Sequence, residues 1–395
     1  MTNADAVALG QRVLTPNYKQ QPIELTRGLG VFVWDADGKR YLDMIAGIAS
    51  LPLGHCHPEL VETLHRQSEL IWHTANTFYN QPSLQLAERL CVLSFGKRVF
   101  LANSGAEAVE AALKAARRYH HVRGEPQRVE VVSLQGSFHG RTLGALAATA
   151  QPKYHEGIGP LPPGFRYIPH GDLAALEASL TPTTAAVIAE IVQGEGGVRP
   201  APRGYFARLR ELCDEAGVLW IDDEVQAGIG RSGALFGYQL EGVTPDVMTL
   251  AKGLGNGIPV GAMIASERVG AALTVGTHAS TFGGNPLACA CALKVLEVVL
   301  RDKLSEASAH GGEYLMGRLF EAKRRGRGEI LEVRGRGLWV GVEVVDAPRT
   351  VARCRELGML VNLAGEKTVR FAPALTIEHP HLDEAAAIFE EAVRA

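Results

Sequence analysis

Cysteine is scarce and irregularly spaced in this chain of 395 residues. There is no CxxC pair and no metal-type spacing with histidine among its six cysteines, which are Cys56, Cys91, Cys213, Cys289, Cys291 and Cys354. Disulfide-rich secreted domains and zinc modules depend on such patterns. We therefore interpret the cysteines as reduced residues of a hydrophobic core, and we expect no metal site.

Long apolar runs and dense stretches of positive charge are also missing. No uncharged apolar run reaches the length of a membrane span, and the N-terminal segment lacks the pattern of a secretory signal. The densest basic cluster, residues 323–327, is too short to follow a phosphate backbone, and the formal net charge is only -3. We expect a cytoplasmic protein that binds neither membranes nor nucleic acid.

The composition that remains, 46% hydrophobic and 21% charged, is typical of a globular protein. Helical patterns at 104–121 and 205–216 alternate with apolar strand patterns, which fall at 98–101, 129–134, 185–192, 218–222, 246–250 and 261–265. Strands alternating with helices predict an α/β fold, with a mainly parallel sheet of about seven strands sandwiched by helices.

The two ends of the chain do not show this regular alternation of strands and helices. Residues 31–43 read as strand, turn and strand, with Asp37-Gly38 as the hairpin signal. Beyond residue 285 a long helical pattern reaches about residue 321, and short strands and a closing helix follow. We expect a large domain at 56–285 and a smaller α+β domain built from 1–55 and 286–395.

One lysine stands at an informative position. The apolar run 247–251 ends at Lys252, and glycines follow at 253, 255 and 257. This pattern predicts a buried strand that stops at a loop, so Lys252 lies at the strand end where open α/β sheets bind ligands. In an apolar pocket a lysine loses charge and becomes a nucleophilic amine. Alternatively, its head group simply reaches water.

Acidic and small residues follow two other strands. Ser104-x-x-Glu107 has the form of a capping box, and the same helix start could bind a phosphate group. Asp222 and Asp223 end a fully apolar strand, where a carboxylate needs a cationic partner such as a pyridinium nitrogen. A helix cap or a surface turn is the alternative for the aspartates.

Aromatic and basic residues near other strands could bind a flat ring and carboxylate groups. Phe138 comes just after strand 129–134 and could stack on a flat ring, while Arg141 could bind a carboxylate through two hydrogen bonds. Arg370 falls inside an apolar strand, where it must be paired, and Glu195 is a candidate partner.

Two weaker motifs are set aside. Residues 228–233 satisfy GxGxxG, but no helix pattern follows them and no acidic residue stands at the distance that dinucleotide binding requires. His55 and His57 look like a metal pair but have no third ligand nearby, which favours turn and packing roles.

Six motifs occur in one order along the chain. They are Ser-Gly-Ala-Glu-Ala (104–108), Ser-Phe-His-Gly-Arg-Thr (137–142), Gly-Glu-Gly-Gly (194–197), Asp-Glu-Val-Gln (223–226), Ala-Lys-Gly-Leu-Gly-Asn-Gly (251–257) and Ser-Thr-Phe-Gly-Gly-Asn-Pro (280–286). Together they resemble the class III pyridoxal-phosphate aminotransferases of fold type I, over nearly the whole chain.

The resemblance implies pyridoxal 5'-phosphate as cofactor and a role for each matching residue. Lys252 would bind the cofactor covalently and move the proton between substrate and cofactor. Asp223 would pair with the pyridinium nitrogen, Gln226 would lie near the phenolic oxygen, and Phe138 would stack on the ring.

The same resemblance implies which residues bind the cofactor phosphate and that a second subunit contributes to the site. Ser104, Gly105 and Ala106 would cradle the phosphate, and Thr281 would reach the phosphate of the neighbouring subunit. A homodimer with shared active sites is therefore expected.

For substrates, Arg141 would bind a carboxylate and Ser280 would lie beside the substrate. Glu195 would cover Arg370 while the amino donor binds and would move away to admit glutamate.

The resemblance implies transfer of the terminal amino group of N-acetylornithine to 2-oxoglutarate, in arginine biosynthesis. Transamination of succinylornithine, ornithine, 4-aminobutyrate or succinyldiaminopimelate stays open, as do an aminomutase or racemase on the same scaffold. A dinucleotide-dependent oxidoreductase and a catalytically silent binding protein are the more distant alternatives.

Overall fold

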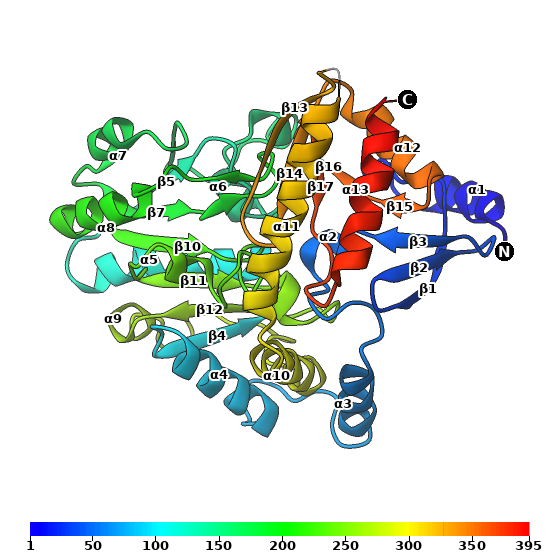
Figure 1. The fold of residues 1–395 in the computed structure, drawn as a ribbon. Helices are drawn as coiled ribbons and strands as arrows, with labels where there is room; N and C mark the ends of the chain where they lie inside the picture. The colour runs from blue at the N-terminus through cyan, green and yellow to red at the C-terminus, as the bar shows by residue number, and fades with distance from the viewer. Residues whose placement is uncertain (327, 395) are drawn as a thin grey trace.

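The computed structural model describes residues 1–326 and 328–394, so Arg327 of the basic cluster and Ala395 lie outside the described residues. Its largest sheet has seven strands in the order β4-β12-β11-β10-β7-β5-β6 (Figure 1). Their bounds are β4 (Arg98–Ala102), β5 (Glu130–Leu134), β6 (Phe165–Ile168), β7 (Thr184–Ala189), β10 (Leu219–Asp223), β11 (Val247–Leu250) and β12 (Gly261–Ala265). Among these strands only β12 runs antiparallel to its neighbours. The predicted α/β fold with a mainly parallel sheet is confirmed.

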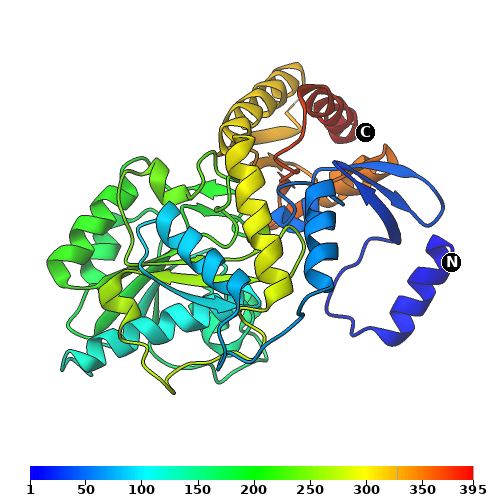
Figure 2. The same cartoon turned by 90° about the horizontal axis from the view of Figure 1, so that it is seen from below.

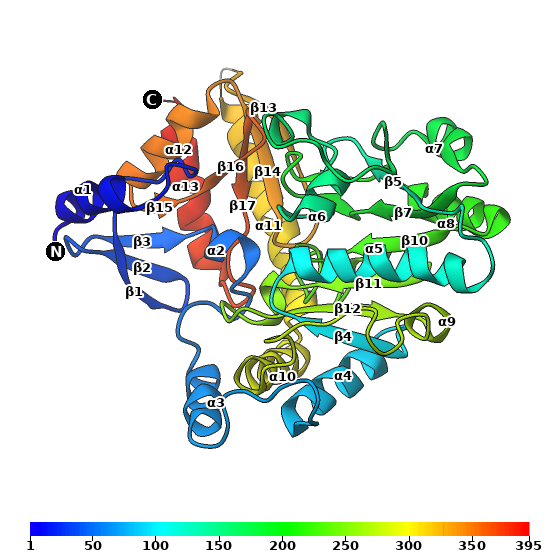
Figure 3. The ribbon, with the colours of Figure 1, turned by 180° about the vertical axis from the view of Figure 1, so that it is seen from behind.

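Helices cover both faces of this sheet, which explains why its strands are apolar without alternation. Helix α5 (Gly105–Val122) packs on β4, β11 and β12 and crosses the face turned to the viewer in Figure 3. Helices α4 (Gln81–Leu93) and α8 (Tyr205–Ala216) pack on β4 and β10. Along β10, Ile221 joins the core under α5, whereas Trp220 stacks on Phe206 of α8.

Two four-stranded sheets lie on the other side of the molecule, in the orders β1-β2-β3-β15 and β13-β14-β17-β16. Their strands are β1 (Leu25–Leu29), β2 (Phe32–Asp35), β3 (Arg40–Asp43), β13 (Ile330–Gly335), β14 (Val340–Val344), β15 (Met359–Leu360), β16 (Asn362–Ala364) and β17 (Thr368–Phe371). Met359 of β15 pairs with Leu42 of β3. The N-terminal hairpin therefore packs with the C-terminal segment, as predicted from the sequence.

The continuous helix expected between residues 285 and 321 is wrong. The structure has two helices there, α10 (Pro286–Arg301) and α11 (Leu304–Arg325). Lys303 between them has φ of 51°, a left-handed conformation that interrupts the helical hydrogen bonds. The apolar pattern continues across the break because both helices bury residues in one core, so periodicity alone did not reveal it.

The remaining elements complete the layers. The helices are α1 (Asn3–Val13), α2 (Ala46–Ala49), α3 (Pro58–Ser68), α6 (Leu143–Ala148), α7 (Leu173–Ser179), α9 (Glu267–Gly270), α12 (Ala347–Glu356) and α13 (His379–Arg394). The expected strand 185–192 is split into β7 and β8 (Val192–Gln193), and β8 pairs with β9 (Arg199–Pro200). Helix α1 has no buried residue and stands apart from the body of the molecule (Figure 2). Within the described residues, no helix is both long and apolar enough to cross a membrane.

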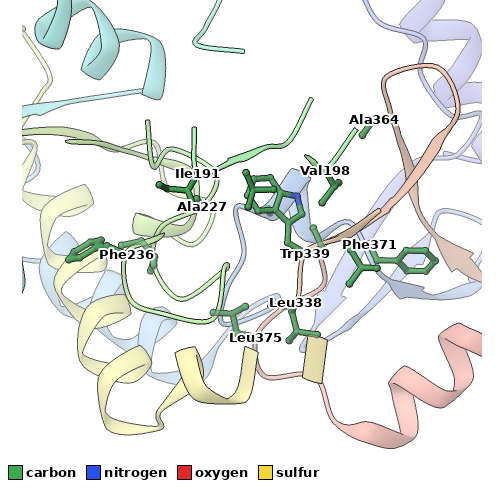
Figure 4. Close-up of a cluster of buried hydrophobic side chains, with 14 of the residues drawn as sticks. Ile191, Val198, Ala227, Phe236, Leu338, Trp339, Ala364, Phe371 and Leu375 are labelled. Atoms are coloured by element: carbon green, nitrogen blue, oxygen red, sulfur yellow. The ribbon is translucent and has the colours of Figure 1, made fainter. Parts of the chain in front are cut away.

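A shared hydrophobic core joins the smaller sheets to the large one. Trp339, which is fully buried just before β14, belongs to the same hydrophobic core as Ile191 and Phe236, which lie in loops at the edge of the large sheet (Figure 4). Phe371 of β17 belongs to the same core. This packing fixes β17, and with it Arg370, beside the carboxyl ends of the parallel strands.

Candidate active site

A cavity of about 410 Å³ lies at the carboxyl ends of the parallel strands. Strands β4, β5, β7, β10 and β11 all run toward this edge, the place where open α/β sheets bind ligands. Residues from the ends of these strands and from the loops after them line the cavity, among them Asn103, Phe138, Glu190, Asp223 and Lys252.

Lys252 lies two residues beyond the end of β11 and begins a short 3-10 turn. Its φ is 38°, a left-handed value that is unfavourable for a lysine and that the surrounding structure must hold in place. Burial lowers the pKa of Lys252, and the charge of Arg370 lowers it further, although Glu195 opposes the shift. More of the amine is therefore uncharged near neutral pH, which is the nucleophilic form.

Asp223 ends β10 and is almost fully buried. Its Oδ2 lies 2.6 Å from Nδ1 of His139, and its Oδ1 accepts hydrogen bonds of 3.0 Å from Thr249 Oγ1 and from the backbone N–H of Val225. No role was predicted for His139, which appeared only as part of a sequence motif. Its position shortly after β5 was the one signal that could have marked it, because the carboxyl ends of β5 and β10 lie at the same edge of the sheet.

The start of α5 forms one wall of the cavity. Ser104 Oγ accepts a hydrogen bond from the N–H of Glu107, but the Glu107 carboxylate accepts from the N–H of Asn103 instead of from Ser104. The predicted capping box is thus only half correct. The N–H groups of Gly105 and Ala106 lie in the first helical turn, where donors lack intrahelical partners and attract anions.

Arg370 and Glu195 form an ion pair, with 2.6 Å between Nη1 and Oε1. The same nitrogen donates to Gln226 Oε1 at 3.1 Å. Burial tends to raise the pKa of Glu195, but the charges of Arg370 and Lys252 outweigh it and hold the pKa below its ordinary value. Glycine is required at 194, since a Cβ there would lie 2.1 Å from Gln226 Oε1 and 2.6 Å from the ring of Trp339, which is fully buried and cannot move aside.

Two further predicted residues come after β5. Phe138 and Arg141 both line the cavity, and the Arg141 guanidinium lies 5.4 Å from the centre of the Phe138 ring. The guanidinium also lies over the ring of Tyr154, a residue that the sequence did not single out.

Ser280 and Thr281 are not brought to the cavity of their own chain. They line a separate surface hollow of about 370 Å³ together with Phe100 and Phe282. Ser280 Oγ accepts a 3.2 Å hydrogen bond from Asn103 Nδ2, and Thr281 is exposed.

Glu190, which follows β7, also lines the cavity but was not predicted from the sequence. Its Oε2 accepts a 3.1 Å hydrogen bond from the N–H of Phe138. Burial and the nearby charge of Asp223 raise the pKa of Glu190 well above its ordinary value. One acidic residue inside the apolar run 184–192 was the signal that could have found it.

The two motifs that were set aside have structural roles. His55 Nε2 lies 2.7 Å from Asp43 Oδ2, and the described residues contain no group of three side chains that could hold a metal ion. In the loop 228–233, Arg231 donates to the carbonyl oxygens of Leu338 and Pro373, so it ties this loop to the C-terminal part of the chain.

The side chains around the cavity fit pyridoxal phosphate. The start of α5 can bind its phosphate, and the Asp223 carboxylate, already held by His139, can pair with a pyridinium nitrogen. Lys252 supplies the amine and Phe138 the aromatic face. The imidazole Nε2 of His139 is buried and has no hydrogen-bond partner in the described residues, as expected for a polar cavity wall.

Comparison with known proteins agrees with this geometry. The family model for class-III aminotransferases matches residues 13–393. The acetylornithine aminotransferase of Myxococcus xanthus is 49% identical over 380 residues, which cover 95% of this chain and 94% of the relative. That of Caldanaerobacter subterraneus is 45% identical, with 96% and 97% covered.

Solved structures show the same similarity. The ornithine aminotransferase of Toxoplasma gondii aligns with a TM-score of 0.96 at 35% identity and covers 100% of this chain and 95% of its own. The acetylornithine aminotransferase of Elizabethkingia anophelis aligns with a TM-score of 0.90 at 33% identity, with 100% and 99% covered.

Proposed function

Because this chain belongs to the class-III aminotransferases, which use pyridoxal 5'-phosphate, we propose that it transfers the terminal amino group of N-acetylornithine to 2-oxoglutarate. This reaction would place it in arginine biosynthesis. The observation that carries the proposal is the 2.6 Å ion pair between Glu195 and Arg370 beside the cavity that Lys252 lines.

The ion pair suits two substrates of different charge. While Glu195 covers Arg370, Arg141 is left to bind the single carboxylate of a donor whose reacting amine has no carboxylate beside it. The side chain of Glu195 is 24% exposed, whereas that of Arg370 is 1% exposed, so the glutamate is the partner that can move. Its departure would uncover Arg370 for the second carboxylate of 2-oxoglutarate.

The chemistry combines the cofactor with residues of this chain. When bound, pyridoxal phosphate supplies an aldehyde that condenses with amines and a ring that accepts electrons. Lys252 Nζ would hold the cofactor covalently and, once the substrate amine has replaced it, would carry the proton between the substrate carbon and the cofactor. Asp223 would keep the ring nitrogen protonated, and the short contact with His139 would hold that carboxylate in place.

The remaining residues would orient the cofactor. Ser104, Gly105 and Ala106 would bind the phosphate at the start of α5, and Phe138 would stack on the ring. Gln226 would approach the phenolic oxygen, and its contact with Arg370 would link cofactor and substrate groups.

Ornithine is the second candidate donor, because the Toxoplasma gondii ornithine aminotransferase has a TM-score of 0.96 with this chain. Turnover of N-acetylornithine, succinylornithine, ornithine and 4-aminobutyrate should be compared, each with 2-oxoglutarate. We expect the highest kcat/KM for N-acetylornithine, and a clear preference for another donor would contradict the proposal. Repeated turnover without 2-oxoglutarate, beyond one equivalent of product per active site, would instead indicate an aminomutase.

A homodimer with shared active sites is part of the proposal. Large apolar side chains are exposed on the segment before α4, including Trp72 at 64%, Phe78 at 71% and Tyr79 at 90%. Asn76 Nδ2 of this segment donates to the carbonyl oxygens of Ser280 and Gly283, so the segment lies beside the loop that carries Thr281. Covering such a surface with a second copy would also bring Thr281 to the phosphate of that copy's cofactor.

We also propose domain boundaries and a location. The seven-stranded sheet lies within residues 98–265 and the smaller sheets outside it, which supports a large domain at 56–285 and a small one from 1–55 and 286–395. The six cysteines are free, which supports a reducing compartment, the cytoplasm. Limited proteolysis tests the boundaries, and cell fractionation tests the location.

A further inference from the structure

The two arginines of the site are held in different ways. Arg370 is buried and paired with a carboxylate, whereas Arg141 is exposed and takes part in none of the ion pairs between described residues. The contacts of the Arg141 guanidinium are aromatic. Its carbon lies 3.8 Å from the centre of the Tyr154 ring and 5.4 Å from that of Phe138.

Tyr154 is itself fixed by its surroundings. It ends a 3-10 turn, Pro152–Tyr154, and its N–H donates to the carbonyl oxygen of Gln151 at 3.0 Å. The Tyr154 and Phe138 rings meet edge to face, with centroids 6.0 Å apart and planes at 85°. Phe138, Tyr154 and Arg141 thus form one packed unit at the cavity wall.

The backbone beside Arg141 is held separately. Glu110 Oε1, on α5, accepts hydrogen bonds from Thr142 Oγ1 at 2.7 Å and from the N–H of Gly144 at 3.0 Å. This fixes the main chain next to Arg141 but does not reach its guanidinium. The long side chain would otherwise move among many rotamers, so the orientation of its head group depends on the rings.

A ring face is a suitable support for a carboxylate-binding arginine. It attracts the cation without occupying its five N–H donors, which lie in the guanidinium plane. A protein carboxylate in the same place would compete with the substrate, as Glu195 does at Arg370.

We propose that Tyr154 is a positioning residue whose ring holds the Arg141 guanidinium and so sets the affinity of the site for the substrate carboxylate. The inference rests on the proposed function, in which Arg141 binds that carboxylate. The Tyr154 hydroxyl makes no hydrogen bond among the described residues, so the ring face carries the effect.

The test compares Tyr154→Met, which keeps side-chain bulk but removes the ring, with Tyr154→Phe, which keeps the ring. The holoenzyme is titrated with glutarate, a dicarboxylate without an oxo group, and binding is followed by the visible spectrum of the cofactor. Tyr154→Met should weaken glutarate binding and raise KM for both substrates roughly 2- to 30-fold, the range expected for a cation–π contact. Tyr154→Phe should stay within about 2-fold of the wild type.

Two further measurements separate the possible failures. The single-turnover half-reaction with a primary amine that lacks a carboxylate should be unchanged in Tyr154→Met, and an equal loss there would overturn the inference, because the ring would then act through Phe138 and the cofactor. Arg141→Met should weaken glutarate binding at least as much as Tyr154→Met. If Arg141→Met weakens binding and a folded Tyr154→Met does not, the inference alone fails. If neither variant weakens binding, the proposed role of Arg141 fails with it.

Discussion

The Nδ1 atom of His139 lies 2.6 Å from Oδ2 of Asp223, and both side chains are buried at the edge of the large sheet. Thr249 and the N–H of Val225 donate to the other carboxylate oxygen. Three contacts from three different segments therefore fix the Asp223 carboxylate before any ligand binds. Such preorganisation allows a charge to stabilise a reacting group without reorganisation during the reaction.

The first prediction compares two neighbouring aspartates. Asp223→Asn removes the charge proposed to pair with the cofactor ring and should lower kcat roughly 100-fold. Asp222→Asn is the matched control, because burial and the neighbouring Glu224 raise the pKa of Asp222 well above its ordinary value. A neutral acid resembles asparagine, so kcat should change little. Steady-state kinetics check both, and similar losses in the two variants would argue against a special role for Asp223.

The second prediction concerns Lys252. Lys252→Ala should keep the fold but lose the covalent link to the cofactor, and activity should fall by about 100-fold or more, because the proton carrier is removed. Reduction with borohydride followed by mass spectrometry should show an adduct in the wild type and none in the variant. Circular dichroism is the control for folding. The same adduct in Lys252→Ala would mean that another residue binds the cofactor.

Residues whose own sequence context demands a particular chemistry could be predicted, whereas residues whose role comes only from a contact with a distant side chain could not. The end of the β11 run marked Lys252, and the apolar strand around Arg370 required a carboxylate partner, for which Glu195 was a candidate; the ion pair is present in the structure. His139 and Tyr154 were not predicted. His139 matters because it contacts Asp223, and Tyr154 because it contacts Arg141, and sequence spacing encodes neither contact.

The fold shows the same division. Alternating strands and helices predicted the large sheet, because buried parallel strands are continuous apolar runs. The break at Lys303 and the short strand β6 were missed, since one depends on a single backbone conformation and the other is only partly apolar. The Glu107 bond to Asn103 instead of Ser104 depends on a one-residue difference in loop geometry that the capping pattern does not determine.

The third prediction separates the two arginines by half-reaction. Arg141→Ala should weaken binding of both donor and acceptor, because both carry a carboxylate for it, whereas Arg370→Gln should mainly impair the half-reaction with glutamate. We expect losses of about 10- to 100-fold in kcat/KM for the affected half-reactions, as for a charge-assisted hydrogen bond. Single-turnover kinetics measure each half-reaction. Equal losses in both half-reactions for Arg370→Gln would contradict the switch.

Glu195 gives the fourth prediction. Glu195→Ala leaves Arg370 uncovered, so preference should shift toward donors that carry the reacting amine beside a carboxylate, such as glutamate and other α-amino acids. The ratio of kcat/KM for glutamate to that for N-acetylornithine should rise about tenfold, since one charge-assisted contact is exchanged. Glu343→Ala, which removes a carboxylate that contacts Arg334 outside the cavity, is the control. An unchanged ratio in Glu195→Ala would remove the gating role.

The fifth prediction is a pH dependence of stability. The pKa of Glu190 in the folded enzyme is raised, chiefly by burial, above the ordinary value near 4.5. The folded state therefore holds its proton more tightly than the unfolded state, so its contribution to stability is complete below pH 4.5 and is lost as pH rises toward the folded pKa.

Glu190→Gln should remove part of that loss, because the amide cannot ionise but can still accept a hydrogen bond from the N–H of Phe138. Between pH 5 and pH 8, the free energy of unfolding of the wild type should fall more steeply than that of the variant, by up to about 1.4 kcal/mol per pH unit. Glu267→Gln is the control, since Arg98 lowers the pKa of that exposed carboxyl and no slope is expected in this range. Denaturant melts across pH measure both, and parallel curves for wild type and Glu190→Gln would refute the assignment.

The last prediction tests the shared active site through mixed dimers. Lys252→Ala removes the amine of its own cavity, and Thr281→Asp places a negative charge where the neighbouring subunit's phosphate is proposed to bind; Thr281 is exposed, so the fold should tolerate the change. Each variant alone should be nearly inactive. In a mixed dimer, one cavity combines an intact Lys252 from one subunit with an intact Thr281 from the other. Random mixing makes half of the dimers mixed, and half of their sites are intact, so co-expression should restore about a quarter of wild-type activity. If mixed dimers are present by native mass spectrometry and activity is not restored, each subunit completes its own site and Thr281 has no role across the interface.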